Sequence, residues 1–267
     1  MTLTIPSPGN DGRYGETADS ERVLISGTDG VQLIVSTPAA DENLWEKYLD
    51  GALRSYRHYG AETALDYSAI RDGASTSLYY ALVDNGVVVG GVRAQGPYRH
   101  ALESHAVIEW SGNAPSQWQI HDDIATRIPY GVVEMKSAWV APSSPYAGKL
   151  SAALARVALP TMERLNIRYV MATAADHVLQ RWESSGGRVN MDIPAAPYPD
   201  ARYRTRIMWW DRHTLATDAD PALYRKMSEE HQHLYHRTSC EARRARHEES
   251  PTTTLSQPDT GKDTQMV

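Results

Sequence analysis

Residues 131–157 read GVVEMKSAWVAPSSPYAGKLSAALARV, and they pass from a strand pattern to a helix pattern within a few positions. The stretch from Gly131 to Val140 is rich in apolar and β-branched side chains and predicts a strand. Ser144-Pro145 then suits a helix cap and a first helical position. Pro160 is expected to kink the helix that follows. Apolar residues mark one face of this helix: Leu150, Leu154, Val157, Met162 and Leu165.

A β-hairpin precedes this stretch. Two β-rich runs, Ser77–Asp84 and Val87–Arg93, are separated by Asn85-Gly86, the pair best suited to a type I′ turn. The remaining pattern predicts strands at residues 31–36, 105–110 and 169–173 and a strand pair within 188–212, with helices at 41–59, 176–184 and, in part, 116–127. The order β, α, several antiparallel β, then β, α, β, α, β, β indicates one mixed domain.

The chain of 267 residues is long enough for one large domain. Residues 1–20 and 249–267 are rich in Pro, Ser, Thr and Asp without hydrophobic periodicity, so they are predicted to be disordered. The domain is placed at residues 21–213. Residues 214–248 are predicted to hold a C-terminal helix that begins at Asp220-Pro221 and docks on the domain or on another subunit, as in a homo-oligomer.

Composition and motifs disfavour several classes of protein. No window approaches the ~20 apolar residues of a membrane-spanning helix, and the N-terminus lacks a secretory signal, so we expect a cytoplasmic protein without a membrane partner. The net charge of -6 disfavours nucleic acid as a partner. The single Cys240 excludes an intrachain disulfide, and no residue spacing predicts a metal site. Hydrolase, nucleotide-phosphate and dinucleotide motifs are missing from the sequence.

The junction between strand and helix is a candidate anion site. A helix N-terminus offers free backbone N–H groups and a partial positive charge to phosphate oxygens. Gly148 would let the backbone approach a ligand closely, and Lys149, unfavourable for the helix dipole, would suit a bound anion. The alternative is that both residues simply begin a helix.

Glu134 stands in the middle of the apolar strand, where a carboxylate is costly unless it is paired or reached by solvent. Strict alternation would place Glu134, Lys136 and Ala138 on one face and Trp139 on the other. Glu134 is therefore our candidate for the base that takes a proton from an attacking amine. The alternative is a buried ion pair of Glu134 with Lys136 or Arg93.

Four segments, taken together and in this order, resemble the GNAT superfamily of acyl-CoA-dependent N-acyltransferases: ALVDNGVVVGGVR, VVEMKSAWVAP, the helix around Gly148, and RYVMATAADHVLQRWESSGGRV. The likeness covers residues 31–212. Glu134 and Arg93 match positions in the branch of N-acyl homoserine lactone synthases and long-chain N-acyl amino acid synthases. The resemblance implies a GNAT-type α+β fold, with a twisted, mostly antiparallel sheet flanked by helices, to which the C-terminal helix is added.

The resemblance also implies a co-substrate. It would be an acyl thioester, carried by CoA or by an acyl carrier protein, with no tightly bound cofactor. The family's phosphate pattern, Arg/Gln-x-x-Gly-x-Gly/Ala, retains only its middle glycine in residues 145–150. The residues implied to hold the thioester are Ala138, Val140, Tyr146, Ala147, Gly148, Lys149 and Leu150.

The implied chemistry is transfer of the acyl group to a small amine, which is either amino-acid-like or of another kind. Glu134 would be the base, and Arg93 and Lys136 would contact the acceptor. A tyrosine usually protonates the departing thiolate; this chain offers His177 and Tyr203, each of which has an alternative as an ordinary surface or strand residue. The competing hypothesis is a noncatalytic GNAT-like domain that binds acyl-CoA or a protein partner.

Overall fold

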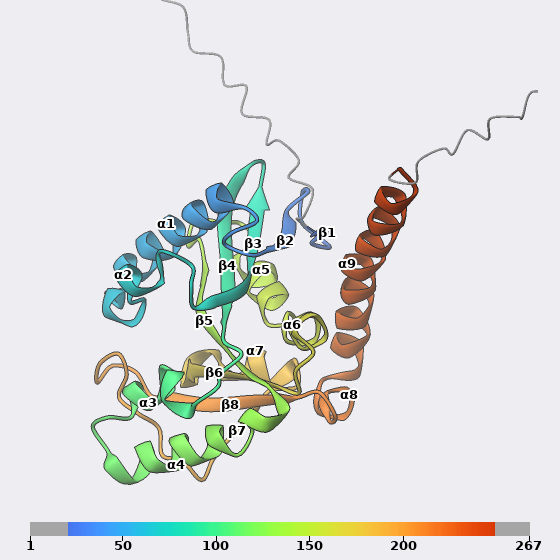
Figure 1. Cartoon of the computed structure of the whole chain (residues 1–267). Coiled ribbons are helices and arrows are strands. Elements are labelled where there is room, and N and C mark those ends of the chain that lie inside the picture. Colours follow the sequence, from blue (N-terminus) through green and yellow to red (C-terminus); the bar gives the residue numbers. More distant parts are fainter. Residues whose placement is uncertain (1–20, 249–267) are drawn as a thin grey trace, which may run out of the picture.

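Figure 1 shows the computed structural model of the chain, which describes residues 21–248 and the side chains of residues 21–234. The predicted disorder of residues 1–20 and 249–267 lies outside the described residues. The described part forms one sheet with helices packed against both of its faces (Figure 1).

The sheet has eight strands in the order β1-β2-β3-β4-β5-β6-β8-β7. Each neighbouring pair is antiparallel except β5 and β6, which are parallel and are joined through helices. This α+β arrangement confirms the fold class that the GNAT resemblance implies. The strands are β1 (Glu21–Leu24), β2 (Gln32–Ser36), β3 (Thr76–Asp84), β4 (Val87–Gln95), β5 (Val132–Val140), β6 (Tyr169–Ala175), β7 (Arg188–Val189) and β8 (Thr205–Asp211).

Helices pack on both faces of the sheet. Their bounds are α1 (Glu42–His58), α2 (Tyr67–Ile70), α3 (Ala106–Glu109), α4 (Ala114–Ala125), α5 (Ala147–Leu154), α6 (Ala158–Leu165), α7 (Leu179–Ser184), α8 (Leu215–Asp218) and α9 (Pro221–Glu248), with 3-10 turns η1 (Glu62–Ala64), η2 (Ala101–Glu103), η3 (Ile128–Tyr130) and η4 (Asp176–Val178). Helix α1 begins where Asp41 accepts a hydrogen bond from the Leu44 amide at 2.9 Å. It packs on one sheet face, against Tyr79 and Trp139.

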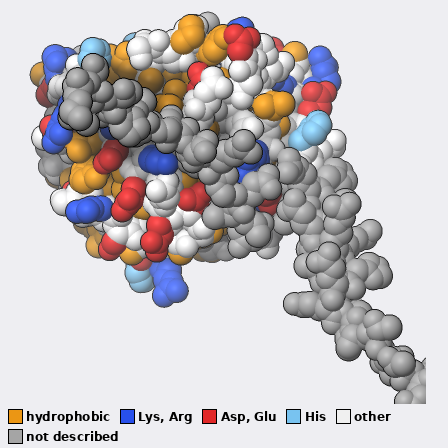
Figure 2. Space-filling view, turned by 90° about the horizontal axis from the view of Figure 1, so that it is seen from above, with side chains coloured by type: hydrophobic (Ala, Val, Ile, Leu, Met, Phe, Trp, Pro, Cys, Tyr) orange, Lys and Arg blue, Asp and Glu red, His pale blue; other side chains and the backbone are white. Residues whose placement is uncertain are grey.

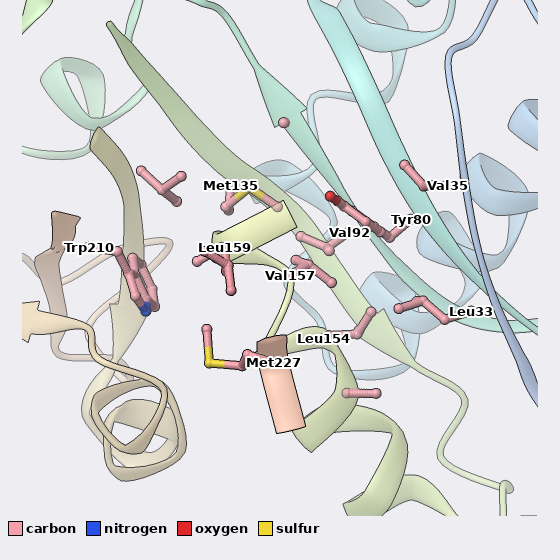
Figure 3. Packing of buried hydrophobic residues seen from close by; sticks show 14 of the residues in the cluster. Leu33, Val35, Tyr80, Val92, Met135, Leu154, Val157, Leu159, Trp210 and Met227 are labelled. Atoms are coloured by element: carbon pink, nitrogen blue, oxygen red, sulfur yellow. The ribbon is translucent and has the colours of Figure 1, made fainter. Parts of the chain in front are cut away.

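Helices α5 and α6 bury the opposite face of the sheet. Figure 3 shows Met135 and Val92 of the sheet facing Val157 and Leu159 of this helical layer. The predicted single helix is interrupted at residues 155–157, between α5 and α6. Pro160 accounts for the break, because proline has no N–H to donate and its ring crowds the carbonyl four residues earlier.

Two local predictions are wrong. Residues 105–110 form the helical turn α3 instead of a strand, with Ala106, Val107 and Trp110 buried and Ile108 exposed. Their burial follows helical spacing, because apolar positions separated by one, three and four residues share a helix face. Helix α5 begins at Ala147 instead of Pro145, since the Ser144-Pro145 segment forms a turn in which Ser144 Oγ accepts from the Tyr146 amide at 3.3 Å.

The other main elements follow the sequence pattern. The hairpin turn between β3 and β4 has positive φ at Asn85 (45°) and Gly86 (81°), as a type I′ turn requires. Both strands of the hairpin, the helix α1 and the strands β5 and β6 lie within a few residues of their predicted bounds.

Helix α9 packs on the domain, which is one of the two predicted arrangements. Asp220 Oδ1 accepts from the amides of Ala222 and Leu223 and begins the helix. Met227 is fully buried in the same cluster as α5 and α6 (Figure 3). Buried Arg156 of the domain forms two hydrogen bonds of 2.7 Å with Glu230 of the helix.

Charges of both signs are interspersed on the surface. Figure 2 shows Lys and Arg side chains lying among Asp and Glu side chains on the face seen from above. Within residues 21–248, no helix combines the length and the apolar content that crossing a membrane requires.

Candidate active site

Strand β5 contains a β-bulge at Ser137. The residue has a φ of 54°, and the β4–β5 register shifts between the pairs Gly91↔Trp139 and Arg93↔Lys136. Two buried side chains hold this conformation: the Tyr48 hydroxyl donates to the Ser137 carbonyl at 2.8 Å, and Arg93 Nε donates to Ser137 Oγ at 3.3 Å. A bulge inserts one extra residue into the strand and re-aims the side chains beyond it.

The bulge changes the predicted faces of β5. Ala138 and Val140 pack with Met135 against α5 and α6, whereas Trp139 packs beneath α1. The prediction that Ala138 shares a face with Glu134 and Lys136 is therefore wrong, because the extra residue exchanges the faces after Ser137.

A pocket opens where β5 and β6 separate. The two strands pair only from Val132↔Tyr169 to Met135↔Ala172; beyond this point β5 follows β4, and β6 follows β8. The pocket has a volume of about 580 Å³. Both separated segments line it, at residues 135–140 and 172–175, together with parts of α1, α5, α7 and the segment before β8.

The inner end of the pocket contains an ion pair between Glu109 of α3 and Lys136 of β5. Lys136 Nζ lies 2.7 Å from Glu109 Oε1, and both residues line the pocket. His105 Nδ1 lies 2.9 Å from the same oxygen, and Thr173 Oγ1 donates to it at 3.0 Å. Glu109 Oε2 is buried and has no hydrogen-bond partner.

These contacts shift both pKa values away from the ordinary range. Burial alone would raise the pKa of Glu109, but Lys136 and His105 outweigh it and hold the pKa at about 2. Burial alone would lower the pKa of Lys136, but Glu109 and then Glu134 raise it above its ordinary value. At neutral pH the pocket therefore presents an ionised carboxylate held by an ammonium group.

Glu134 is fully buried behind this ion pair. Its Oε2 accepts hydrogen bonds from the Tyr98 hydroxyl at 2.6 Å, from Ser104 Oγ at 2.8 Å and from the His105 amide at 3.1 Å. Its Oε1 lies 3.5 Å from Lys136 Nζ. Glu134 does not line the pocket and reaches it only through Lys136, so the structure contains the predicted pairing with Lys136.

Arg93 is 3% exposed and does not line the pocket. Besides its bond to Ser137, the guanidinium donates to three neutral side chains, those of Ser75, Thr76 and Gln95. Its contacts therefore hold the bulge and the ends of β3 and β4 together. The expected contact of Arg93 with the acceptor amine stays a prediction, because Arg93 lies outside the pocket lining. The expected contact of Lys136 with that amine also stays a prediction, but Lys136 does line the pocket.

The residues predicted to hold the thioester divide into two groups. Ala138, Val140 and Ala147 line the pocket, whereas Tyr146, Gly148, Lys149 and Leu150 do not. The Tyr146 hydroxyl donates to Asp29, and Lys149 Nζ donates to the Gly27 carbonyl, so the turn between β1 and β2 contacts the start of α5. Leu150 is buried in the core beneath this turn.

The two predicted general acids lie together at the pocket. His177 of η4 and Tyr203, in the segment before β8, both line it, and their rings are 6.4 Å apart. The structure thus brings His177, Tyr203 and Lys136 to one pocket from three distant parts of the sequence.

Several pocket residues were not predicted. Glu109 lines the pocket, and His105, four residues earlier, contacts it from the same side of a helical turn. The strand predicted for residues 105–110 would not bring these two side chains together. Tyr56 and Tyr198 also line the pocket, as does Trp139. No local pattern marks these three, because they meet only after α1 and the segment before β8 fold against β5.

Comparison of sequences reveals relatives in mycobacteria. Rv1356c and MT1399 of Mycobacterium tuberculosis and Mb1391c of Mycobacterium bovis, each described as an uncharacterized protein, are 50% identical to the chain over 197 residues. Each match covers 73% of this chain and 74% of the relative. No protein-family model matches the chain.

Solved structures with a similar fold include three synthases. FeeM, an N-acyl amino acid synthase from uncultured soil microbes, is 12% identical, with a TM-score of 0.48 over 73% of this chain and 99% of that chain. BjaI, a CoA-dependent acyl-homoserine lactone synthase, is 16% identical, with a TM-score of 0.47 over 73% and 88%. The AHL synthase LasI is 16% identical, with a TM-score of 0.49 over 72% and 98%. At these identities no residue's role is carried over.

Proposed function

The chain belongs to the family of the mycobacterial proteins Rv1356c, MT1399 and Mb1391c, and we propose that it is an N-acyltransferase that moves an acyl group from a thioester to a small amine. The observation that carries this proposal is the pocket between the separated ends of β5 and β6, with an ionised carboxylate at its inner end. The co-substrate would be acyl-CoA or an acyl carrier thioester, and no tightly bound cofactor is needed.

The thioester has a suitable path through this pocket. Beyond Met135 and Ala172, β5 and β6 are not hydrogen-bonded to each other, so backbone N–H and C=O groups of both strands face the gap between them. An extended ligand could bind to these groups. Apolar side chains line both sides of the gap, among them Ala138 and Val140 of β5 and Ala174 of β6. The acyl carbonyl would then lie near the bulge at Ser137, and the acceptor amine would approach from the side of Glu109.

The proposed chemistry needs one proton acceptor and one proton donor. An ammonium has no lone pair, so the acceptor must lose a proton before its nitrogen attacks the carbonyl carbon. We assign the contact with the amine to Glu109, whose free Oε2 belongs to a pocket-lining residue. As the carbon–sulfur bond breaks, the thiolate would take a proton from His177 or Tyr203.

The sequence favours Glu134 as the base, but in this scheme Glu134 does not contact the amine. Glu134 contacts Lys136 Nζ and accepts a hydrogen bond from the His105 amide, and the Lys136 ammonium and the His105 ring in turn contact the Glu109 carboxylate. The two assignments differ in their consequences. If Glu109 contacts the amine, Glu109→Gln should reduce kcat more strongly than Glu134→Gln does; the reverse order would make Glu134 the base.

One observation favours the competing hypothesis of a noncatalytic domain. The polar groups of Tyr146 and Lys149, predicted to meet a phosphate, are already bonded to Asp29 and to the Gly27 carbonyl. A pyrophosphate would have to displace this turn or bind beside it.

The test is an acyl-transfer assay on the full-length protein. Acyl-CoAs of increasing chain length are combined with a panel of small amines, and free thiol and amide product are measured. We expect thiol release that depends on the amine, that falls at least about a hundredfold in Glu109→Gln, and that is unchanged in the matched control Glu46→Gln, an exposed residue of α1. Thermal stabilisation by acyl-CoA without amine-dependent thiol release would instead support the noncatalytic domain.

A further inference from the structure

The inner end of the pocket has an unfilled hydrogen-bond acceptor. The Glu109 side chain is 1% exposed, and its Oε1 already receives Lys136 and Thr173 and contacts His105. Its Oε2 receives nothing, although the residue lines the pocket. A buried carboxylate oxygen without a donor is unfavourable, so the geometry suits a ligand that brings N–H groups to this atom.

Aromatic side chains stand beside the same carboxylate. Tyr56 of α1 and Tyr198 both line the pocket, and the Tyr198 ring meets the His105 ring edge-on at 5.6 Å. The pKa of Tyr198 is raised to about 12, first by burial and then by the negative charge of Glu109. Burial, with a smaller contribution from Glu109, also raises the pKa of Tyr56. A pocket whose lining combines a carboxylate with tyrosine rings is a favourable environment for an organic ammonium.

The cations near this end have no capacity for a second carboxylate. Lys136 Nζ already contacts two carboxylates, Glu109 at 2.7 Å and Glu134 at 3.5 Å, and His105 Nδ1 lies 3.1 Å from it. Arg93 is turned to the strand ends and lies outside the pocket lining. The pocket's other basic side chains, His177 and Arg181, belong to η4 and α7, beyond the last residue of β6. A carboxylate on the amine-bearing carbon of an acceptor would therefore face Glu109 without a partner.

We propose that the acceptor is a primary ammonium whose amine-bearing carbon carries no carboxylate: an alkylamine, an amino alcohol or an amino-acid amide instead of a free α-amino acid. This inference rests on the proposed N-acyltransferase function and narrows its acceptor. An unpaired like charge beside Glu109 acts as the discriminating element against amino acids.

The reaction balances without a further reagent. The amine nitrogen forms a bond to the acyl carbonyl carbon, and the carbon–sulfur bond breaks with its electron pair on sulfur. Of the two protons that the ammonium gives up, one passes to solvent, while Glu109 holds the amine nitrogen by a hydrogen bond. The thiolate takes up the equivalent of the other, so that amide, thiol and one proton are the products.

The test compares acceptors that differ only at the amine-bearing carbon. Two matched sets are used with one acyl-CoA: tyramine, tyrosinamide and tyrosine, and ethanolamine, serinamide and serine. We measure kcat/KM from thiol release and identify the amide by mass spectrometry. The amine and the amide of at least one set should exceed the free amino acid by about tenfold or more, a ratio that one unpaired buried charge readily produces.

The possible outcomes distinguish failure of this inference from failure of the proposed N-acyltransferase function. Preference for tyrosine or serine, or equal use of all three members, would overturn the inference and leave the N-acyltransferase intact. Absence of turnover with both sets, together with no thermal stabilisation by any acyl-CoA, would defeat the N-acyltransferase and the inference with it. Stabilisation by acyl-CoA without turnover of either set would overturn the inference as well.

A variant tests whether Glu109 is the source of the discrimination. In Glu109→Gln the preference for tyrosinamide over tyrosine should fall to about threefold or less, even though overall turnover is reduced. The control Glu46→Gln should keep the wild-type ratio, because its exposed carboxylate lies outside the pocket. A ratio that is unchanged in Glu109→Gln would contradict the assignment, and the acceptor series on the wild-type protein stands independently of whether this variant folds.

Discussion

Replacement of Lys136 by methionine isolates the electrostatics of the pocket. Met has a similar length and no charge, so Glu109 and Glu134 lose the only ammonium within 3.5 Å of either among the described residues. Both carboxylates are almost fully buried, at 1% and 0% side-chain exposure. Removal of one partner from a buried ion pair leaves an uncompensated charge, which typically costs about 3–5 kcal/mol.

The structure indicates which carboxylate would respond. Glu134 keeps its three hydrogen bonds from Tyr98, Ser104 and the His105 amide, whereas Glu109 loses its strongest partner. Glu109 would therefore be driven to protonate in Lys136→Met. For an acid with the ordinary pKa of 4.5, protonation costs about 3 kcal/mol at pH 7 and about 1 kcal/mol at pH 5. The free energy of unfolding should thus fall by about 3 kcal/mol at pH 7, and the deficit should shrink at pH 5.

Urea unfolding of the wild type and of Lys136→Met at both pH values measures this effect. The double variant Lys136→Met/Glu109→Gln removes both charges, so it should recover about 2 kcal/mol or more relative to the single variant. A deficit below about 1 kcal/mol at pH 7, or one that is equal at pH 5 and pH 7, would refute the reasoning. A double variant less stable than the single one would do the same.

Three further predictions concern the wild-type charge, the close packing of α1 and the docking of α9. The pKa of Glu109 is about 2 instead of its ordinary 4.5, so the ionised carboxylate stabilises the folded protein fully above pH 4.5 and loses this contribution as the pH falls toward 2. The difference in free energy of unfolding between wild type and Glu109→Gln should therefore narrow by about 3 kcal/mol over this range. Urea unfolding at a series of pH values measures it. Gly51→Ala should destabilise the protein by about 1–3 kcal/mol and change the near-ultraviolet circular dichroism, because the added Cβ would clash with the Trp139 ring. A gain in stability from the higher helix propensity of alanine would contradict this packing. Met227→Ala should lower the free energy of unfolding by about 2–5 kcal/mol, because Met227 is fully buried, whereas an unchanged urea midpoint would show that α9 is not docked.

The sequence predicts those parts of the fold that local chemistry determines. Asn85-Gly86 specifies the hairpin turn because its two residues adopt positive φ at little cost. Pro160 marks the interruption between α5 and α6 because proline removes a backbone donor. Residues 105–110 are misread, because a short apolar run suits a strand or a buried helical turn and only its packing partners decide between them.

The site is harder to predict than the fold because its contacts span long stretches of chain. The sequence singles out Lys136, His177 and Tyr203, and all three line the pocket. It does not indicate Glu109, whose bond to Lys136 joins residues 27 positions apart. The bulge at Ser137 also lacks a local signal, because serine is not a residue that favours positive φ; buried Tyr48 and Arg93 impose the conformation from other strands and helices.

The central claim is that the pocket between β5 and β6 binds an acyl thioester, and a pocket-filling variant tests it most directly. Ala138→Phe places a ring in the pocket from β5, and Ala222→Phe makes the same change at an exposed position of α9. The measurement is the shift in melting temperature produced by acyl-CoAs of increasing chain length.

We expect wild type and Ala222→Phe to be stabilised by acyl-CoA, by about 3 kcal/mol at a concentration a hundred times Kd. Ala138→Phe should remain folded without ligand and should lose the shift. Equal stabilisation of all three proteins would place the ligand elsewhere, and the absence of any shift in the wild type would contradict the account.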